Sequence, residues 1–91
     1  MNAFSPRILK NASRQLKKLD PPVAKRIVGQ ITWLAEHFEE IKAEALKGDL
    51  AGLFKYRHGD YRIIYEPIRR EKVIVIHEIG HRSEIYKQAR P

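Results

Sequence analysis

The sequence contains no cysteine and no long apolar run. The lack of thiols excludes disulfides and zinc sites with thiolate ligands, and it favours a reducing, cytoplasmic location. The longest purely aliphatic run covers residues 73–76, which is far too short to span a membrane. Lys10 interrupts the only apolar stretch near the start, so we expect no signal peptide.

Acidic residues are also scarce. The 91 residues hold 11 Asp and Glu against 18 Lys and Arg, which gives a formal net charge of +7. This excess predicts attraction to a polyanion, which could be nucleic acid, an acidic protein or an anionic membrane surface. The cations are spread over both halves of the chain, so folding must bring them together at any such site. The length predicts one domain spanning residues 1–91.

Two amphipathic helices are predicted in the first half of the chain. A short strand over residues 2–5 leads into Ser5-Pro6, a pair that is typical of a helix start. Asp20-Pro21-Pro22 ends the first helix and begins a second, which we expect to run from about Pro21 to Phe38. A tight turn between them makes an antiparallel hairpin. Apolar residues at helical spacing mark the buried side of the first helix: Ile8, Leu9, Ala12, Leu16 and Leu19.

From Leu53 onward the period of the apolar residues changes to two, which predicts strands. Segments 53–57 and 61–66 flank a turn at residues 58–60, and a further strand covers residues 72–79. The prediction is an α+β fold in which the helix hairpin packs on one face of a mainly antiparallel sheet of four or five strands. One strand face carries the large side chains that should meet the helices: Phe54, Tyr56, Tyr61, Ile63 and Tyr65.

Three cations, Lys55, Arg57 and Arg62, fall on the other face of the same strands. Like charges that lie opposite each other across a hairpin destabilise it, so we expect an anion to offset their repulsion. Arginine binds phosphate oxygens through two parallel hydrogen bonds, and lysine adds a point charge. The tyrosines of the first face could stack on nucleobases, but the helices should cover that face, which favours a role in the core.

A second basic segment, IGHRSEIYK at residues 79–87, contains His81, Arg82 and Tyr86. Tyrosine and histidine can stack on a base or transfer a proton. No cluster of His, Asp and Glu has the spacing of a metal site, and neither a phosphate-binding glycine loop nor a nucleophile elbow is present. We therefore expect no metal and no cofactor, and these residue types suit cleavage of an RNA phosphodiester.

The stretch LKGDLAGLFKYRHGDYRIIYE, followed by EIGHRSEIYK, resembles the RelE/ParE toxin superfamily and its RelE branch in particular. The helix segment LKKLDPPVAKRI extends the resemblance to nearly the whole chain. It implies a RelE-like fold and the toxin component of a type II toxin–antitoxin system. It also implies a ribosome-dependent endoribonuclease that cuts mRNA in the ribosomal A site. In that reaction the mRNA 2′-OH attacks the adjacent phosphate, leaving a 2′,3′-cyclic phosphate and a 5′-OH end.

The resemblance also implies which residues act in the reaction. Arg62 and Lys55 are expected to stabilise the developing negative charge, and Arg57 to orient the phosphate. Tyr86 or His81 is expected to transfer protons, and either His81 or Arg82 takes the position of the family's C-terminal arginine. The candidate catalytic residues are therefore Lys55, Arg57, Arg62, His81, Arg82 and Tyr86.

The partners implied are a cognate RelB-like antitoxin, the ribosome with its mRNA, and operator DNA bound only through the antitoxin complex. Two other functions stay open: a ParE-like DNA gyrase inhibitor without nuclease activity, and a non-catalytic nucleic-acid-binding module. ParE-type chains generally lack clustered sheet cations, which favours the nuclease. One basic helix face is either solvated or docked on ribosomal RNA phosphates, and it comprises Lys10, Arg14, Lys17 and Lys18.

Overall fold

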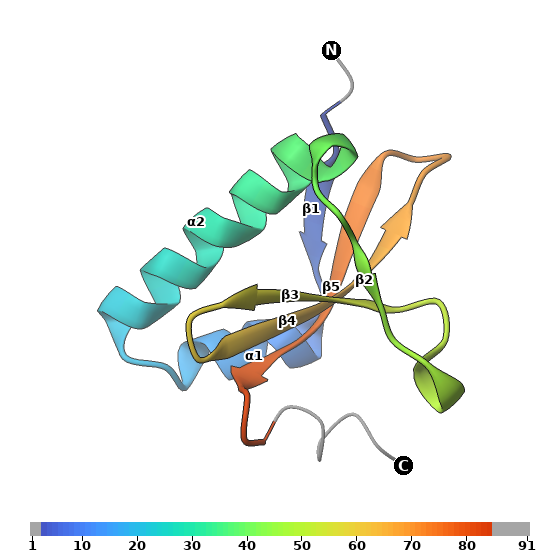
Figure 1. Ribbon diagram of the computed structural model, residues 1–91. Coiled ribbons are helices and arrows are strands. Elements are labelled where there is room, and N and C mark those ends of the chain that lie inside the picture. Colours follow the sequence, from blue (N-terminus) through green and yellow to red (C-terminus); the bar gives the residue numbers. More distant parts are fainter. Residues whose placement is uncertain (1–2, 85–91) are drawn as a thin grey trace.

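The computed structural model describes residues 3–84, which form a five-stranded sheet with two helices (Figure 1). The strand order is β1-β5-β4-β3-β2, and only the β1–β5 pair is parallel. This confirms the predicted α+β fold. The helices are α1 (Lys10–Lys17) and α2 (Pro21–His37), with short 3₁₀ helices at Phe38–Glu40 and Gly48–Leu50. The strands are β1 (Ser5–Ile8), β2 (Glu44–Ala45), β3 (Phe54–His58), β4 (Tyr61–Ile68) and β5 (Val73–His81).

The predicted start of the first helix at Ser5-Pro6 is wrong, because these residues belong to strand β1 and α1 begins only at Lys10. Pairing with β5 decides the conformation: Ser5 lies opposite Val73, and the Ser5 N–H donates to the Lys72 carbonyl oxygen at 2.9 Å. Pro6 has no N–H, but an edge strand tolerates it because one side of its backbone needs no partner. The predicted strand over residues 2–5 therefore lies too early in the chain.

Helix α1 covers the part of β5 that extends past β1. The register ends at Ile8 opposite Ile76, and beyond it side chains of α1 replace the missing strand. The Gln15 Oε1 atom accepts the Ile79 N–H at 2.6 Å, and the Asn11 amide donates to the Glu78 carboxylate. An open strand edge exposes unpaired backbone groups that invite aggregation, so these contacts protect the sheet.

Strands β3 and β4 form a tight hairpin around Gly59 and Asp60. Gly59 has a φ of 60°, which lies in the left-handed region that glycine adopts without steric cost. The turn places His58 opposite Tyr61 and Arg57 opposite Arg62. Because side chains alternate along a strand, this register fixes which residues of the hairpin share a face.

The core lies between the helices and one face of the sheet. Phe54, Tyr56 and Tyr61 pack against it, as predicted, and Tyr65 is fully buried within it. The ring centroids of Tyr65 and Phe54 are 5.8 Å apart. Among residues 3–84, no helix is both long and apolar enough to cross a membrane. The buried cluster consists of Phe4, Ala12, Ile27, Ile31, Leu34, Ala35, Phe38, Ile63, Tyr65, Ile74, Ile76 and Ile79.

A candidate nucleic-acid interface

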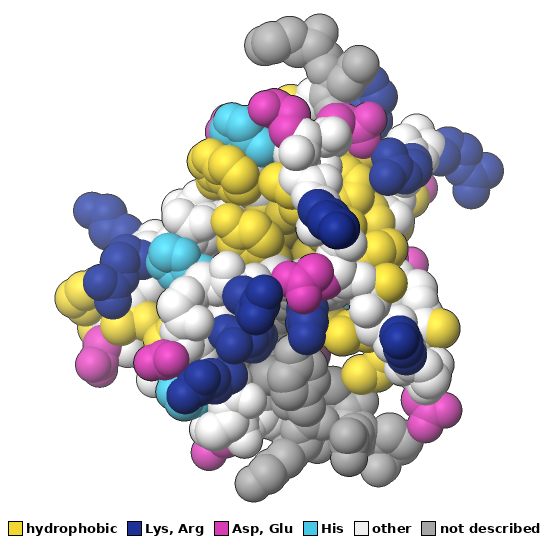
Figure 2. Space-filling view, in the orientation of Figure 1, with side chains coloured by type: hydrophobic (Ala, Val, Ile, Leu, Met, Phe, Trp, Pro, Cys, Tyr) yellow, Lys and Arg dark blue, Asp and Glu magenta, His cyan; other side chains and the backbone are white. Residues whose placement is uncertain are grey.

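The predicted cations of β3 and β4 lie on the face of the sheet that the helices leave free, which we call the helix-free face. Arg57 pairs directly with Arg62, and Lys55 pairs with Ile64. Their strand neighbours, including Tyr56 and Ile63, point into the core. Figure 2 shows Lys and Arg side chains gathered over β3 and β4 with an acidic side chain at their border. The expected side of the sheet is therefore confirmed, and two arginines occupy directly paired positions on neighbouring strands.

The hairpin turn joins Arg62 to Arg82, which follows the end of β5. The Arg62 Nη1 group donates to the Gly59 carbonyl oxygen at 3.0 Å and to the Tyr61 carbonyl oxygen at 3.0 Å. The Arg82 backbone N–H donates to the Asp60 carbonyl oxygen at 2.8 Å, and its Nε lies 3.8 Å from the Asp60 carboxylate. The turn thus holds both arginines at one end of the sheet. We call Lys55, Arg57, Arg62 and Arg82 the cation cluster.

One carboxylate beside the cation cluster was missed by the sequence analysis. Glu44 in β2 pairs with Lys55, and its carboxylate lies 4.0 Å from the Lys55 Nζ and 3.4 Å from the Arg57 Nε. A strand of two residues has no alternation from which it could be predicted. Only the pairing with β3 reveals that Glu44 holds two of the cations in place.

Of the remaining candidates for catalysis, His81 is not gathered with the cation cluster. His81 lies opposite Tyr61, on the face that carries the helices, and the two ring centroids are 5.8 Å apart. The His81 Nδ1 atom also contacts the Ser83 hydroxyl at 2.8 Å. Tyr86 lies outside the described residues. The structure therefore separates His81 from Arg57 and Arg62 by the thickness of the sheet.

The basic residues of α1 form a separate surface. Lys10, Arg14, Lys17 and Lys18 are all exposed, as expected for the outer face of the helix. Arg14 and Lys18 border a shallow hollow with Glu78, the β5 residue that binds Asn11 and Gln15. No group of three or more His, Asp or Glu side chains within residues 3–84 is arranged to hold a metal ion.

Comparison with known proteins agrees with this architecture. The family model of the ParE toxin of type II toxin–antitoxin systems, parDE, matches residues 7–86. The chain belongs to this family of toxins. The toxin RelG of Mycobacterium tuberculosis is 31% identical over 91 residues, which cover 93% of this chain and 98% of RelG. Both matches confirm the resemblance to the RelE/ParE superfamily.

Solved structures place this toxin among RelE-like folds. The RelBE2 toxin–antitoxin complex of M. tuberculosis superposes with a TM-score of 0.81 and 28% identity, covering 89% of this chain and 93% of that chain. The RelE–RelB complex of Pyrococcus horikoshii gives a TM-score of 0.69 and 26% identity, covering 88% of this chain and 96% of that chain. A free double mutant of Escherichia coli RelE superposes with a TM-score of 0.73 and 23% sequence identity, covering 96% of this chain and 94% of that chain. At this level of identity the similarity supports the fold alone.

A buried tyrosine of β4 makes the stability of this toxin depend on pH. Burial, with smaller contributions from Glu44 and Tyr56, raises the pKa of Tyr65 from 10.0 to about 12. Its hydroxyl is buried and has no hydrogen-bond partner among residues 3–84. An unfolded chain loses this proton near pH 10, but the folded chain keeps it until near pH 12. The free energy of unfolding therefore falls as the pH rises from 10 to 12, and the contribution of Tyr65 to this fall is about 3 kcal/mol.

We expect Tyr65→Phe to abolish that part of the pH dependence. At neutral pH the free energy of unfolding of the variant should equal that of the unsubstituted chain or exceed it by up to about 1 kcal/mol, because the substitution removes a buried hydroxyl without a partner. Urea unfolding at pH 7 and between pH 10 and 12 measures both effects. A variant that is clearly less stable at pH 7 would show that the hydroxyl is satisfied in the folded protein.

Proposed function

We propose that this toxin is a ribosome-dependent, metal-independent endoribonuclease that cleaves mRNA in the A site and thereby inhibits translation. The observation that carries the proposal is the gathering of Lys55, Arg57 and Arg62 on the helix-free face, with Arg82 held at the same end of the sheet. Arg57 and Arg62 are directly paired across the strands, and the Glu44 carboxylate beside Lys55 and Arg57 is one negative charge against these three cations, so part of their repulsion is left for a further anion to offset. A phosphate of RNA supplies that anion, and the fold of a type II toxin makes translation a fitting target.

The roles within the cluster follow from charge and access. Attack of the 2′-OH on the adjacent phosphorus and departure of the 5′ oxygen concentrate negative charge on the phosphate oxygens. A guanidinium has five N–H donors, and the bonds of Arg62 to the turn use only Nη1. The Nε and Nη2 groups of Arg62 are assigned to the transition state together with Lys55, and Arg57 and Arg82 orient the phosphate.

We assign proton transfer to Tyr86 rather than to His81. His81 contacts Tyr61 and Ser83 on the face away from the cation cluster, so its ring is poorly placed for the 2′-OH of a phosphate bound there. A general base must lie within hydrogen-bond reach of the proton that it takes. Tyr86 follows Arg82 in the chain and carries the resemblance to the RelE branch.

The proposed protein partner is a RelB-like antitoxin. Several structural neighbours are toxin–antitoxin complexes that contain RelB. An acidic segment laid over Lys55, Arg57 and Arg62 would offset the same charges as the RNA phosphate, so antitoxin binding and RNA binding should exclude each other. The exposed basic face of α1 is then left to contact ribosomal RNA, and operator DNA is reached through the antitoxin complex.

The rival function is gyrase inhibition, which the match to the ParE family model keeps open. The purified chain is added to a translating extract, in which mRNA ends are mapped by primer extension, and a gyrase supercoiling assay is run in parallel. Codon-spaced cuts with normal supercoiling support the nuclease. Intact mRNA with blocked supercoiling supports the ParE-like function, and silence in both assays leaves a non-catalytic binding module.

A further inference from the structure

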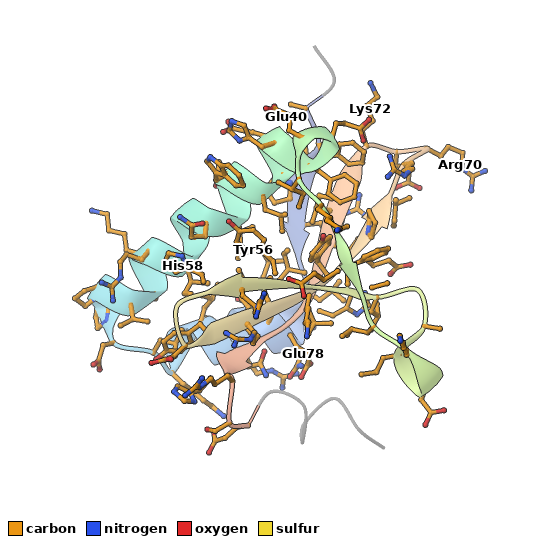
Figure 3. All side chains as sticks on the ribbon, viewed as in Figure 1. Glu40, Tyr56, His58, Arg70, Lys72 and Glu78 are labelled. Atoms are coloured by element: carbon orange, nitrogen blue, oxygen red, sulfur yellow. The ribbon has the colours of Figure 1, made fainter. Side chains whose placement is uncertain are left out.

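A pocket lies behind the hairpin turn, on the opposite side from the cation cluster. It has a volume of about 290 Å³ and opens between the first turns of α2 and the tip of β3 and β4. Figure 3 shows His58 in the space between α2 and the hairpin. This volume is near the lower end of small-molecule sites, so the pocket suits a flat ligand of a few rings. Its lining consists of Val23, Arg26, Ile27, His58, Gly59, Asp60 and Tyr61.

The chemistry of this pocket is that of a site for a nucleobase. Val23 and the Tyr61 ring are half-buried and offer apolar surface for a flat face, whereas Ile27 in the pocket wall is buried. Base stacking on aromatic side chains is worth about 1–3 kcal/mol. Arg26 at the rim donates hydrogen bonds, and an arginine reads the N7 acceptor that both purines present. An acidic peptide would meet one cation here, Arg26, beside the carboxylate of Asp60.

The pocket and the cation cluster meet at the turn. Asp60 lines the pocket, and its carboxylate lies 3.8 Å from the Arg82 Nε. The register places His58, Tyr61 and His81 in one row across the three strands, on the face with the helices. The adjacent row on the helix-free face contains Arg57 and Arg62. The end of the sheet therefore offers cations for a phosphate on one face and aromatic rings for a base on the other.

We propose that this pocket holds the base of a purine nucleotide that flanks the cleaved phosphate, so that the RNA bends around the Gly59–Asp60 turn. This inference rests on the proposed nuclease function and deepens it, because it names residues that select the cleavage sequence. Arg26 reads the purine, Tyr61 stacks on it, and the cation cluster holds the phosphate next to it. The pocket acts on the choice of site, and the cation cluster acts on the rate.

The test compares Arg26→Gln with Lys25→Gln in the primer-extension assay. Both residues are exposed cations on α2, but only Arg26 lines the pocket, so the control matches in charge and in helix position. Mapping several hundred cuts on a mixed mRNA pool gives the base composition on each side of the cut. We expect Arg26→Gln to reduce the preference for a purine at one flanking position by about tenfold. Lys25→Gln should leave this preference unchanged.

The outcomes separate this inference from the function on which it rests. If Arg26→Gln cuts mRNA and the base composition around its cuts equals that of the unsubstituted chain, the pocket assignment is overturned and the nuclease function stands. Loss of antitoxin affinity with unchanged base composition overturns it as well, because the pocket then holds protein. If the unsubstituted chain cuts no mRNA, the nuclease function fails and the inference falls with it.

Discussion

Arg62→Ala is expected to lower mRNA cleavage in a translating extract by about 100- to 1000-fold, the range measured when one donor to a transition-state oxyanion is removed. The chain should nevertheless stay folded. Arg62 is only half-buried, and its substitution relieves the repulsion from Arg57 on the neighbouring strand. The hydrogen bonds that are lost lie beside the hairpin turn, where the one to the Gly59 carbonyl oxygen is exposed and the one to the Tyr61 carbonyl oxygen is part-buried. Activity and stability should therefore respond in opposite directions.

The matched control for this prediction is Arg70→Ala. Arg70 is an exposed arginine in the turn between β4 and β5, and Figure 3 shows it far from the hairpin tip. Arg70→Ala removes the same charge from the chain as Arg62→Ala, so any general effect of net charge on ribosome binding appears in both variants. A loss of cleavage that is equal in the two variants would mean that Arg62 contributes only long-range attraction.

Ile76→Ala should give the largest loss of stability among single truncations of β5. Ile76 is fully buried, and β5 is the strand to which β1, β4 and α1 are all attached. Removing such a side chain costs about 3–4 kcal/mol through lost burial and the cavity left behind. For a domain of this size that corresponds to a fall of about 15 °C in Tm. Toxicity in cells should then fall because less folded protein is present.

Val28→Ala serves as the comparison, because Val28 lies on α2 with 43% of its surface exposed. It should change the free energy of unfolding by less than about 0.5 kcal/mol. Urea unfolding of both variants measures the difference. Equal effects at the two positions would contradict the core described for this fold.

Local patterns predicted the β3–β4 hairpin and its faces. Alternation from Leu53 onward and a glycine in the turn leave few other registers, and the observed pairing of Arg57 with Arg62 follows from them. Contacts distant in sequence were not predictable. Ser5 and Pro6 adopt a strand because β5 offers a free edge more than 60 residues away, as the pairing of Ser5 with Val73 shows. Their local preference for a helix start is overridden by that pairing.

The residues of the site also divide into those that local patterns predict and those that depend on contacts distant in sequence. Lys55, Arg57 and Arg62 could be placed together from one hairpin, whereas Arg82 needed the contact of its backbone with Asp60. Glu44 could not be assigned, because its position depends on a two-residue strand pairing with β3. His81 was expected near the phosphate, but β5 continues to this residue, so the strand alternation turns its ring to the face of Tyr61.

The most direct test of a phosphate site on the helix-free face is an NMR titration of the arginine Nε–Hε resonances. The ligand is a short RNA in which one 2′-deoxy nucleotide prevents cleavage. Arg57, Arg62 and Arg82 are predicted to shift together with one dissociation constant, while Arg70 stays unchanged. Shifts confined to Arg14 on α1, with these three arginines unaffected, would contradict a phosphate site on this face of the sheet.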